Sequence, residues 1–289
     1  MKVIHNDDIE WKRGLQHRGG TFHFRHMFDG EENTPGNFQF NLGRIEGDFE
    51  SPRHHHNFEQ FRFQVDGVMK FGRNGNMSAG TFGYFPEGAY YGPQSADGSG
   101  TTAVLQFGGA SGQGYLSRRQ VAEGRVALEK MGKFEGGVFR RNEDVEGKRN
   151  RDGYQAIWEN YHGRDMTYPK PRVRDPVLID PENYEWTGIG EGVFEKPMGV
   201  FTERRCEANF VKLDKGASWT GKGRSIYLVV SGAGSVNGQA YKTLSGVQCA
   251  EGETPVFAAS EESVLLHLGL PNLAGLEGRL DRAVAEAAE

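Results

Sequence analysis

The sequence is poor in three features, each of which would have indicated a particular class of protein. Its 289 residues hold only two cysteines, Cys206 and Cys249, too few for a disulfide framework, so we expect free thiols, with a single bridge left open. No apolar run approaches the length of a membrane span. Positive charge is not in excess, because 34 basic residues face 39 acidic ones and the formal net charge is −5, which argues against nucleic-acid binding.

The first residues, MKVIHNDDIEWKRG, also lack the apolar core of a secretion signal. We therefore expect a cytoplasmic protein that binds neither nucleic acid nor membrane and acts on a small-molecule substrate, with a homodimer as an open alternative. What the sequence does hold is 42 glycines, 19 phenylalanines and a hydrophobic share of 36%. This composition is typical of a β-rich globular protein with many turns, and the length suits one large domain or two ordinary ones.

The most informative stretch is residues 51–67, SPRHHHNFEQFRFQVDG, in which polar and apolar residues alternate as in a strand with two different faces. The polar face would carry His54, His56, Gln60, Arg62 and Gln64. The opposite face would carry Phe61, Phe63 and Val65. Two imidazoles that converge from one strand form half of a metal site. Such a face could simply lie in water, or it could line the interior of a barrel that holds a ligand.

A second stretch, residues 80–91, reads GTFGYFPEGAYY, a short strand followed by a Pro-x-Gly turn. Together the two stretches resemble the signature motifs of the cupin superfamily, G(x)5HxH(x)3–4E(x)6G and G(x)5PxG(x)2H(x)3N. The positions that fit are His54, His56, Gly67, Gly80, Pro86 and Gly88, and the opening glycine of the first motif is displaced by one, at Gly47. The resemblance implies a β-barrel that carries a metal site in this half of the chain.

The sequence departs from these motifs at three positions. The metal-binding Glu of the family falls on Gln60, the second-motif His on Tyr91, and the closing Asn on Ser95. Glu59 is adjacent to Gln60, but strand phase points it the other way, so ligation by Glu59 would need a bulge. The resemblance then implies a ligand set of His54, His56, Gln60 and Tyr91. This set is weak, because Gln brings no charge and Tyr must lose its proton, and a metal-free pocket is the alternative.

The second half of the sequence repeats the same order of elements in degraded form. SIYLVVSG at 225–232 corresponds to the strand that ends at Gly67, but Thr220–Gly223 stand where the histidines would be. No histidine occurs around Pro255, so this half resembles a cupin without a metal site. His267 lies among leucines and is expected to be a core residue.

Helical patterns lie between and after the two barrel-like halves, at 117–131, at 153–161, and in the tail with Leu273, Leu276, Leu280 and Val284. We therefore predict an all-β protein with two cupin-type antiparallel barrels, a bicupin. The predicted domains are a barrel with the metal site at 1–112, a partly helical linker at 113–175, and a degenerate barrel with a terminal helix at 176–289.

The resemblance implies a function for the first barrel. Cupins with metal sites are commonly dioxygenases, decarboxylases, isomerases or lyases that act on small polar molecules. A divalent transition metal held by few protein ligands leaves positions for O₂ or a chelating substrate, which favours a metal-dependent oxygenase with Fe(II), with Mn, Ni or Zn as alternatives. We expect Arg62 and Gln64 to bind an anionic substrate, and Tyr91 and Arg62 to be the catalytic residues. An isomerase or lyase, and a bicupin that binds a small molecule without catalysis, remain alternatives.

Overall fold

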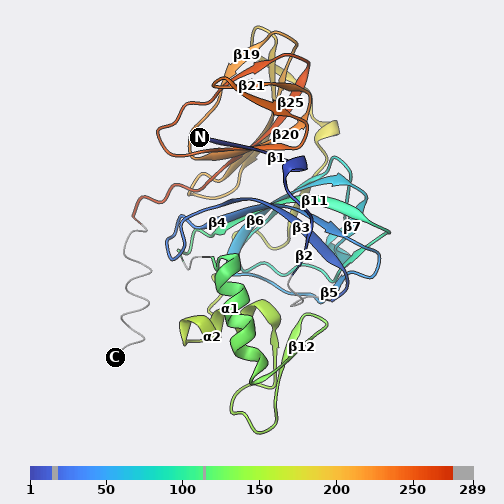
Figure 1. Ribbon diagram of the computed structural model, residues 1–289, viewed down its shortest axis with the longest axis vertical. Helices are drawn as coiled ribbons and strands as arrows, with labels where there is room; N and C mark the ends of the chain where they lie inside the picture. The colour runs from blue at the N-terminus through green and yellow to red at the C-terminus, as the bar shows by residue number, and fades with distance from the viewer. Residues whose placement is uncertain (15–18, 113–114, 276–289) are drawn as a thin grey trace. The chain divides into compact units, whose positions relative to one another are not determined.

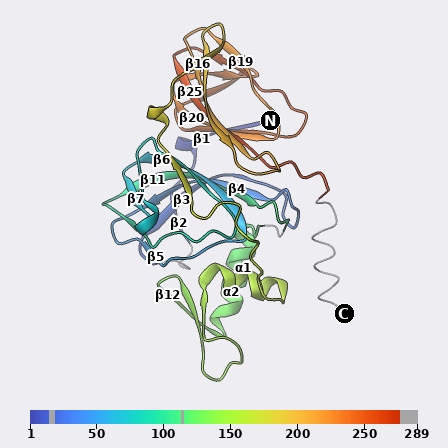
Figure 2. The same ribbon diagram turned by 180° about the vertical axis from the view of Figure 1, so that it is seen from behind.

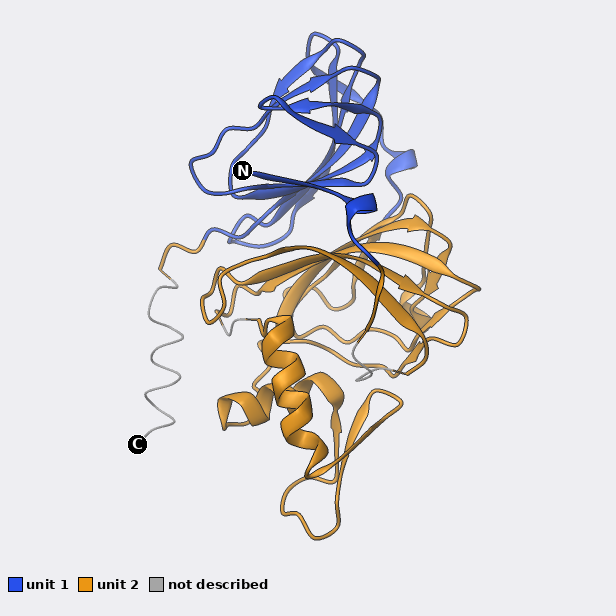
Figure 3. Ribbon diagram, in the orientation of Figure 1, with its two compact units in different colours: residues 1–10, 179–272 blue, residues 11–178, 273–289 orange. Residues whose placement is uncertain are grey.

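The computed structural model describes residues 1–14, 19–112 and 115–275 (Figure 1). These residues form two compact units (Figure 3). Unit 2 is built on residues 11–178, and unit 1 combines residues 1–10 with residues 179–272. Both units are predominantly β-structure, as predicted from the sequence.

Unit 2 contains a seven-stranded sheet and a four-stranded sheet. The larger has the order β15-β9-β6-β11-β4-β3-β2, with β2 (Lys12–Arg13), β3 (Phe22–Asp29), β4 (Phe38–Ile45), β6 (Phe58–Asp66), β9 (Phe82–Phe85), β11 (Gly100–Gly108) and β15 (Val177–Ile179). The smaller has the order β5-β10-β7-β8, with β5 (Glu50–Ser51), β7 (Val68–Lys70), β8 (Asn76–Ser78) and β10 (Gln94–Ala96). The central strands β9, β6, β11, β4 and β3 pair antiparallel, and β6, which follows the histidines, lies in the middle of the sheet.

A helical segment follows β11 in the chain. It contains α1 (Arg118–Glu129), α2 (Gly153–His162) and a small sheet of β12 (Gly132–Glu135), β13 (Val138–Arg141) and β14 (Asn150–Asp152). Ser117 and Gln120 form a capping box at the start of α1, and Asp152 caps α2. The two helices lie side by side in both views (Figures 1 and 2).

The helical segment belongs to unit 2 and does not behave as a separate linker. Its apolar side chains form one buried cluster with Phe58 at the start of β6. Tyr115, Tyr154 and Trp158 are members of this cluster. Burial of this size stabilises the segment against the barrel, because each large side chain contributes about 1.5–3 kcal/mol when it is removed from water. The segment therefore forms part of the wall of the barrel.

Unit 1 repeats the architecture of unit 2. Its larger sheet has the order β1-β23-β20-β25-β18-β17-β16, with β1 (Lys2–His5), β16 (Thr187–Gly190), β17 (Val193–Val200), β18 (Glu207–Leu213), β20 (Ser225–Ser231), β23 (Ser245–Cys249) and β25 (Ser263–Gly269). Its smaller sheet has the order β19-β24-β21-β22, with β19 (Ser218–Thr220), β21 (Ala233–Val236), β22 (Gln239–Lys242) and β24 (Val256–Ala259). The order β23-β20-β25-β18-β17 matches β9-β6-β11-β4-β3, so the predicted internal repeat is present, and β20 occupies the place of β6.

The edge strands depart from the predicted domain bounds. β1 precedes the barrel of unit 2 in the sequence, yet it pairs with β23 of unit 1, with Lys2 opposite Gln248. β15, which precedes the strands of unit 1, lies beside β9 of unit 2. The range 1–112 therefore includes β1, which belongs to the sheet of unit 1, and lacks β15, which belongs to the sheet of unit 2. The helical segment expected to be a linker, 113–175, packs within unit 2.

Several smaller expectations concern single residues. Cys206 and Cys249 are free, buried thiols. His267 is a buried core residue, whose Nε2 lies 2.8 Å from Ser225 Oγ. Among the described residues, none of the helices has the length and apolar character needed to cross a membrane. The predicted terminal helix depends on Leu276, Leu280 and Val284, which lie outside the described residues.

Candidate active site

Cross-strand pairing gathers polar side chains on the inner face of the larger sheet of unit 2. One row across the sheet joins Gln39 of β4, Gln106 of β11, Gln60 of β6 and Phe85 of β9. The next row joins Asn41, Val104, Arg62 and Gly83. Residues opposite each other on paired strands share a face, so the carboxamides of two distant segments join those of β6. The register shift between β11 and β6 occurs at Thr101/Thr102, beyond both rows.

These rows form one wall of a cavity of about 230 Å³. His54, His56, Tyr91 and Gln94 line it from the loops and the smaller sheet. Phenylalanines of β3 and of the loop that follows β4 line it further, namely Phe22, Phe24 and Phe49. The helical segment closes it with Tyr115, Arg118, Val121 and Tyr154. The cavity therefore combines an aromatic lining with a few converging polar groups, which is typical of small-molecule sites.

His54 and Tyr91 are positioned by a short antiparallel bridge between their loops. The Nδ1 atom of His54 lies 2.7 Å from the carbonyl oxygen of Pro52. A carbonyl only accepts, so Nδ1 carries the proton, and in neutral imidazole the lone pair is then on Nε2. His54 Nε2 lies 3.1 Å from Tyr91 Oη, so the phenol can donate its hydrogen to this nitrogen.

The Pro-x-Gly turn holds the second histidine of the motif. The backbone N–H of Gly88 donates to the carbonyl oxygen of His56 over 2.7 Å. Gly88 has a φ of +77°, and a Cβ atom there would lie 2.3 Å from the carbonyl oxygen of Pro169. Only glycine fits such a position without strain. The rings of His54 and His56 are 4.8 Å apart between centroids, so the turn holds both imidazoles against the same cavity.

Arg62 is buried at the base of the cavity, with 8% of its surface exposed. Its Nε and Nη2 donate to Gln60 Oε1 over 3.2 and 2.8 Å, and its Nη1 donates to Gln94 Oε1 over 2.9 Å. Nη2 also lies 3.2 Å from Tyr91 Oη. The guanidinium carbon is 4.5 Å from the centre of the Phe85 ring. These contacts fix the guanidinium beside Tyr91 in surroundings of low polarity.

The predicted metal ligands do not all present a donor atom to the cavity. Gln60 Oε1, the only metal-binding atom of that side chain, accepts two hydrogen bonds from Arg62, and its Nε2 donates to Tyr91 Oη over 2.9 Å. An amide flip would turn N–H groups toward the guanidinium, so this orientation follows from the chemistry of the contact. The Gln60 oxygen therefore does not fit a metal site. Among the described residues, no three His, Cys, Asp or Glu side chains converge.

His54 Nε2 and Tyr91 Oη have the spacing that two ligands of one transition metal need. Two donors bound at a right angle to a divalent metal, each at about 2.1 Å, lie roughly 3 Å apart. His54 Nε2 and Tyr91 Oη have this separation, and the proton on His54 Nδ1 is held by a carbonyl, as is usual for metal-binding histidines. The second imidazole lines the same cavity.

Two other residues of β6 lie away from the cavity. Gln64, expected to bind substrate, is fully buried in the sheet, where Thr102 Oγ1 donates to its Oε1 and its Nε2 donates to the carbonyl oxygen of Asp66, both over 2.8 Å. It is not among the residues that line the cavity. Glu59 lies on the opposite face, where Tyr84 Oη donates to its Oε2 over 2.8 Å. No bulge turns Glu59 inward, because Gln60 keeps its register with both neighbouring strands.

The Glu59 carboxyl is ionised with difficulty. Its burial, followed by the neighbouring charge of Glu87, raises its pKa from 4.5 to about 7, while the Tyr84 hydrogen bond and the Arg172 charge act in the opposite direction. Glu87 itself is held by Arg172 Nη1 over 2.8 Å and by Ser111 Oγ over 2.6 Å. This acidic pair lies behind the inner face of the sheet and does not contact the cavity.

The sequence did not indicate what the helical segment contributes to the site. Tyr115 Oη lies 2.7 Å from Gln39 Oε1 and 2.8 Å from Gln106 Oε1, so it joins the first carboxamide row. Burial raises the pKa of Tyr115 and of Tyr154 above the ordinary value, so both phenols are neutral hydrogen-bonding groups. The sequence pattern predicts residues 153–161 as a helix of a linker, and the aromatic side chains of Tyr154, Trp158 and Tyr161 are the only local signal of a larger role.

Comparison with known proteins finds solved structures with a similar architecture but no match in sequence. No family model matches the sequence, and no curated protein matches it. Among solved structures, a candidate dioxygenase from Nostoc punctiforme is similar with a TM-score of 0.63 at 9% identity, over 94% of this chain and 83% of that chain. Oxalate decarboxylase from Bacillus subtilis gives a TM-score of 0.54 at 12% identity, over 94% and 76% of the two chains. The pirin from Escherichia coli, solved with nickel(II), gives 0.52 at 12% identity, over 93% and 99%.

Identities this low establish the fold alone. Together with the repeated strand order of the two units, they show that the chain has a cupin fold twice over, a bicupin, as the motifs had indicated.

Proposed function

We propose that the barrel of unit 2 is the active site of a metal-dependent oxygenase that acts on a small organic anion, with Fe(II) as the favoured metal and Mn, Ni or Zn as alternatives. The observation that carries this proposal is the convergence of three groups on Tyr91 Oη. His54 Nε2, Gln60 Nε2 and Arg62 Nη2 lie 3.1, 2.9 and 3.2 Å from this oxygen, at the wall of one cavity. The fold of the candidate dioxygenase supports the choice of chemistry by analogy only.

His54 and His56 would hold the metal through ring nitrogens, and Tyr91 would be the third protein ligand. A metal bound there supplies coordination positions for O₂ and for an oxygen atom of the substrate. Arg62 binds the anionic group of the substrate, because a guanidinium in a poorly polar environment attracts a carboxylate or enolate more strongly than one in water. Ligation requires Tyr91 to lose its proton; a Tyr91 that keeps its proton instead serves as a positioned proton donor to a substrate oxygen.

The histidine triplet offers a matched test of the metal site. His54 and His56 line the cavity, whereas His55 stacks on Tyr90 and Tyr168 with ring centroids 3.9 and 3.5 Å apart. Metal content of the untagged protein should fall to background in the His54→Ala/His56→Ala variant and should be retained in His55→Ala. A full equivalent of metal in the double variant would show that the site lies elsewhere.

An isomerase or lyase is the second candidate, and the contact between Tyr91 and His54 favours it, because a phenol hydrogen-bonded to an imidazole is a ready acid–base pair. The two candidates differ in their need for oxygen. Turnover that stops under anaerobic conditions, with O₂ consumed in step with product, supports the oxygenase. Turnover that continues unchanged without O₂ supports the isomerase or lyase instead.

A further inference from the structure

The lining of the cavity in unit 2 is strongly asymmetric in charge. Arg13, Arg62 and Arg118 all contribute to it. None of the described residues that line it carries a carboxylate. Arg62 alone would be enough to bind one anionic group, so the additional guanidinium groups call for a ligand of greater charge.

Arg118 is the most informative of the other two. It is the first residue of α1 and lies on the cavity wall with part of its surface buried. Its guanidinium carbon stacks 3.6 Å above the centre of the Phe24 ring. Among the described residues, the Arg118 guanidinium has no hydrogen-bond partner. Desolvation lowers its pKa, and the charge of Asp29 only partly offsets this effect. A partly buried guanidinium without hydrogen bonds is costly unless a ligand completes its contacts.

A chain of neutral polar groups leads from Arg62 to the neighbourhood of Arg118. Gln60 Oε1 accepts from Arg62, and Gln106 Nε2 donates to the same oxygen over 3.3 Å. Gln106 Oε1 lies 2.8 Å from Tyr115 Oη, and the Arg118 charge is close enough to the Tyr115 phenol to act on its pKa. Carboxamides and a phenol thus connect Arg62 to the neighbourhood of Arg118, and phenylalanines line the same cavity.

We infer that the ligand of this cavity is a small organic dianion, with one acidic group bound by Arg62 and the second bound by Arg118. The inference rests on the proposed function for the site of the first acidic group. The apolar middle of the ligand lies among the phenylalanine rings, and its polar atoms face the carboxamide wall. Arg118 then acts as a residue that selects dianions over monoanions of the same length.

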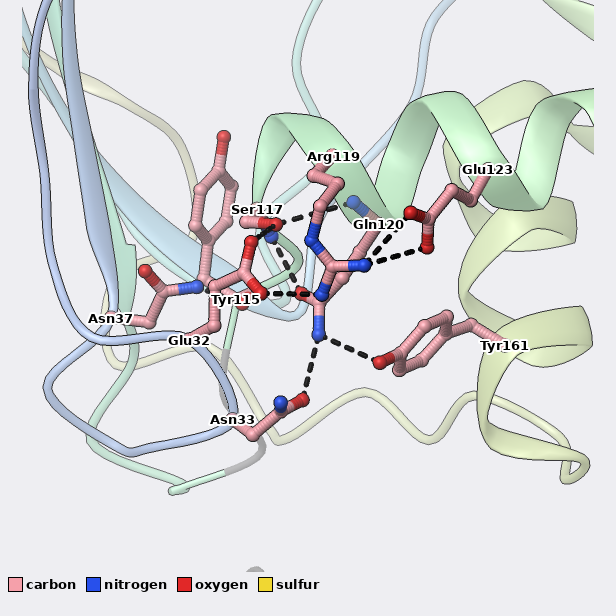
Figure 4. A network of polar contacts seen from close by, with 9 residues as sticks. All are labelled: Glu32, Asn33, Asn37, Tyr115, Ser117, Arg119, Gln120, Glu123 and Tyr161. Atoms are coloured by element: carbon pink, nitrogen blue, oxygen red, sulfur yellow. Dashed lines mark hydrogen bonds and ion pairs between the residues drawn. The ribbon is translucent and has the colours of Figure 1, made fainter.

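The residues on either side of Arg118 anchor the start of α1, and one of them, Arg119, supplies a control (Figure 4). Ser117 Oγ donates to Glu32 over 2.5 Å, and Gln120 Nε2 donates to Asn33 over 2.6 Å and to Tyr161 over 2.9 Å. Arg119, next to Arg118, binds Glu32 and Glu123 and does not line the cavity. Replacement of Arg119 by a neutral residue therefore changes the net charge of the protein as much as replacement of Arg118 does, but leaves the cavity lining unchanged.

The experiment compares binding of dicarboxylates and monocarboxylates by calorimetry. Succinate, glutarate and adipate are paired with butyrate, pentanoate and hexanoate, which have the same chain lengths. We expect at least one dicarboxylate to bind roughly tenfold to a hundredfold more tightly than its partner, as one added charge-assisted contact would provide. Arg118→Met should abolish this preference without weakening the monocarboxylate, and Arg119→Met should retain it. Arg118→Lys, which keeps the charge, should retain part of it.

Two results would overturn the inference. One is a preference for dicarboxylates that survives in Arg118→Met, and the other is equal or absent binding of both acid classes by the parent protein. If Arg118→Met does not fold, Arg118→Lys is compared with the parent instead. Lysine changes the hydrogen-bond geometry, so an unchanged preference for dicarboxylates in Arg118→Lys would count against a direct contact between Arg118 and the ligand. Arg62→Met distinguishes failure of the dianion inference from failure of the proposed anion site. Loss of all acid binding in Arg62→Met, with no effect of Arg118→Met, refutes the dianion and leaves the proposed anion site intact.

Discussion

His54 and Tyr91 are joined by both their backbones and their side chains. The backbone N–H of His54 donates to the Tyr91 carbonyl over 3.1 Å, that of Tyr91 donates to the His54 carbonyl over 2.9 Å, and His54 Nε2 lies 3.1 Å from Tyr91 Oη. Two loop residues are thereby held as firmly as neighbours in a sheet. A site built on loops gains from such a bridge, because its reacting atoms must be placed to within a fraction of an ångström.

Replacement of Tyr91 by Phe removes the oxygen on which His54, Gln60 and Arg62 converge. We expect turnover to fall by about two orders of magnitude, as loss of a positioned proton donor or metal ligand does. Stability should fall by only about 1 kcal/mol, because the ring still packs against Phe85. Visible absorption of the oxidised, iron-loaded protein should also disappear if Tyr91 is a ligand.

Tyr84→Phe is the matched control, since that hydroxyl donates to Glu59 on the opposite face of the sheet. The control should keep its turnover and its spectrum. Full activity in Tyr91→Phe would mean that its hydroxyl has no part in the chemistry.

Replacement of Gln60 by Glu tests whether Arg62 is available to a ligand because its partner is neutral. A carboxylate in place of the Gln60 amide would accept the same two hydrogen bonds from Arg62 as a charged pair. We expect the Kd or KM of an anionic substrate to rise by roughly tenfold or more. Gln239→Glu adds the same charge on an exposed strand of unit 1 and should have no effect. Unchanged affinity in Gln60→Glu would argue against anion binding by Arg62.

Glu59 should make the protein less stable as pH rises. Its pKa is about 7 in the folded protein and near 4.5 when unfolded, so between these values the folded state binds more protons and the free energy of unfolding decreases with pH. The difference corresponds to about 3 kcal/mol above pH 7, and to none below pH 4.5.

Glu59→Gln removes the ionisable group and keeps an acceptor for Tyr84. Chemical denaturation should therefore show the variant to be more stable than the parent at pH 8 and similar to it near pH 4.5. A difference between the two proteins that does not change with pH would contradict this account.

Gly88→Ala should destabilise unit 2 more than its backbone angle alone explains. Gly88 and Gly136 both have a positive φ, +77° and +55°, but an added Cβ meets the Pro169 oxygen at 2.3 Å in the first case and nothing within 4 Å in the second. Gly136→Ala should therefore cost about 1 kcal/mol, and Gly88→Ala should cost more by about 1–3 kcal/mol, which thermal unfolding can measure. Equal losses in the two variants would mean that the Pro169 segment shifts freely.

The orientation of side chains on β6 could be predicted from the sequence, because alternation along a strand is a local property. Arg62 faces inward and Glu59 outward, as their positions in the strand indicated. Strand phase could not show that Gln64 lies beyond the end of the cavity, since phase gives the face and not the depth. Gln39 and Gln106 join the site through pairing between distant segments, and Arg118 through packing of a helix, neither of which leaves a local pattern.

The edge strands have a consequence for the order in which the chain can fold during synthesis. β1 leaves the ribosome before the barrel of unit 2, but its partner β23 (Ser245–Cys249) is made after that barrel, so β1 must wait unpaired while the barrel of unit 2 forms. That barrel in turn lacks β15 until residue 179 has emerged. Because pairing between distant segments is slow, early β1 is open to partners on other chains during this interval. A cut at residue 112 would leave both halves incomplete, whereas a fragment of residues 11–179 would contain every strand of its own sheets.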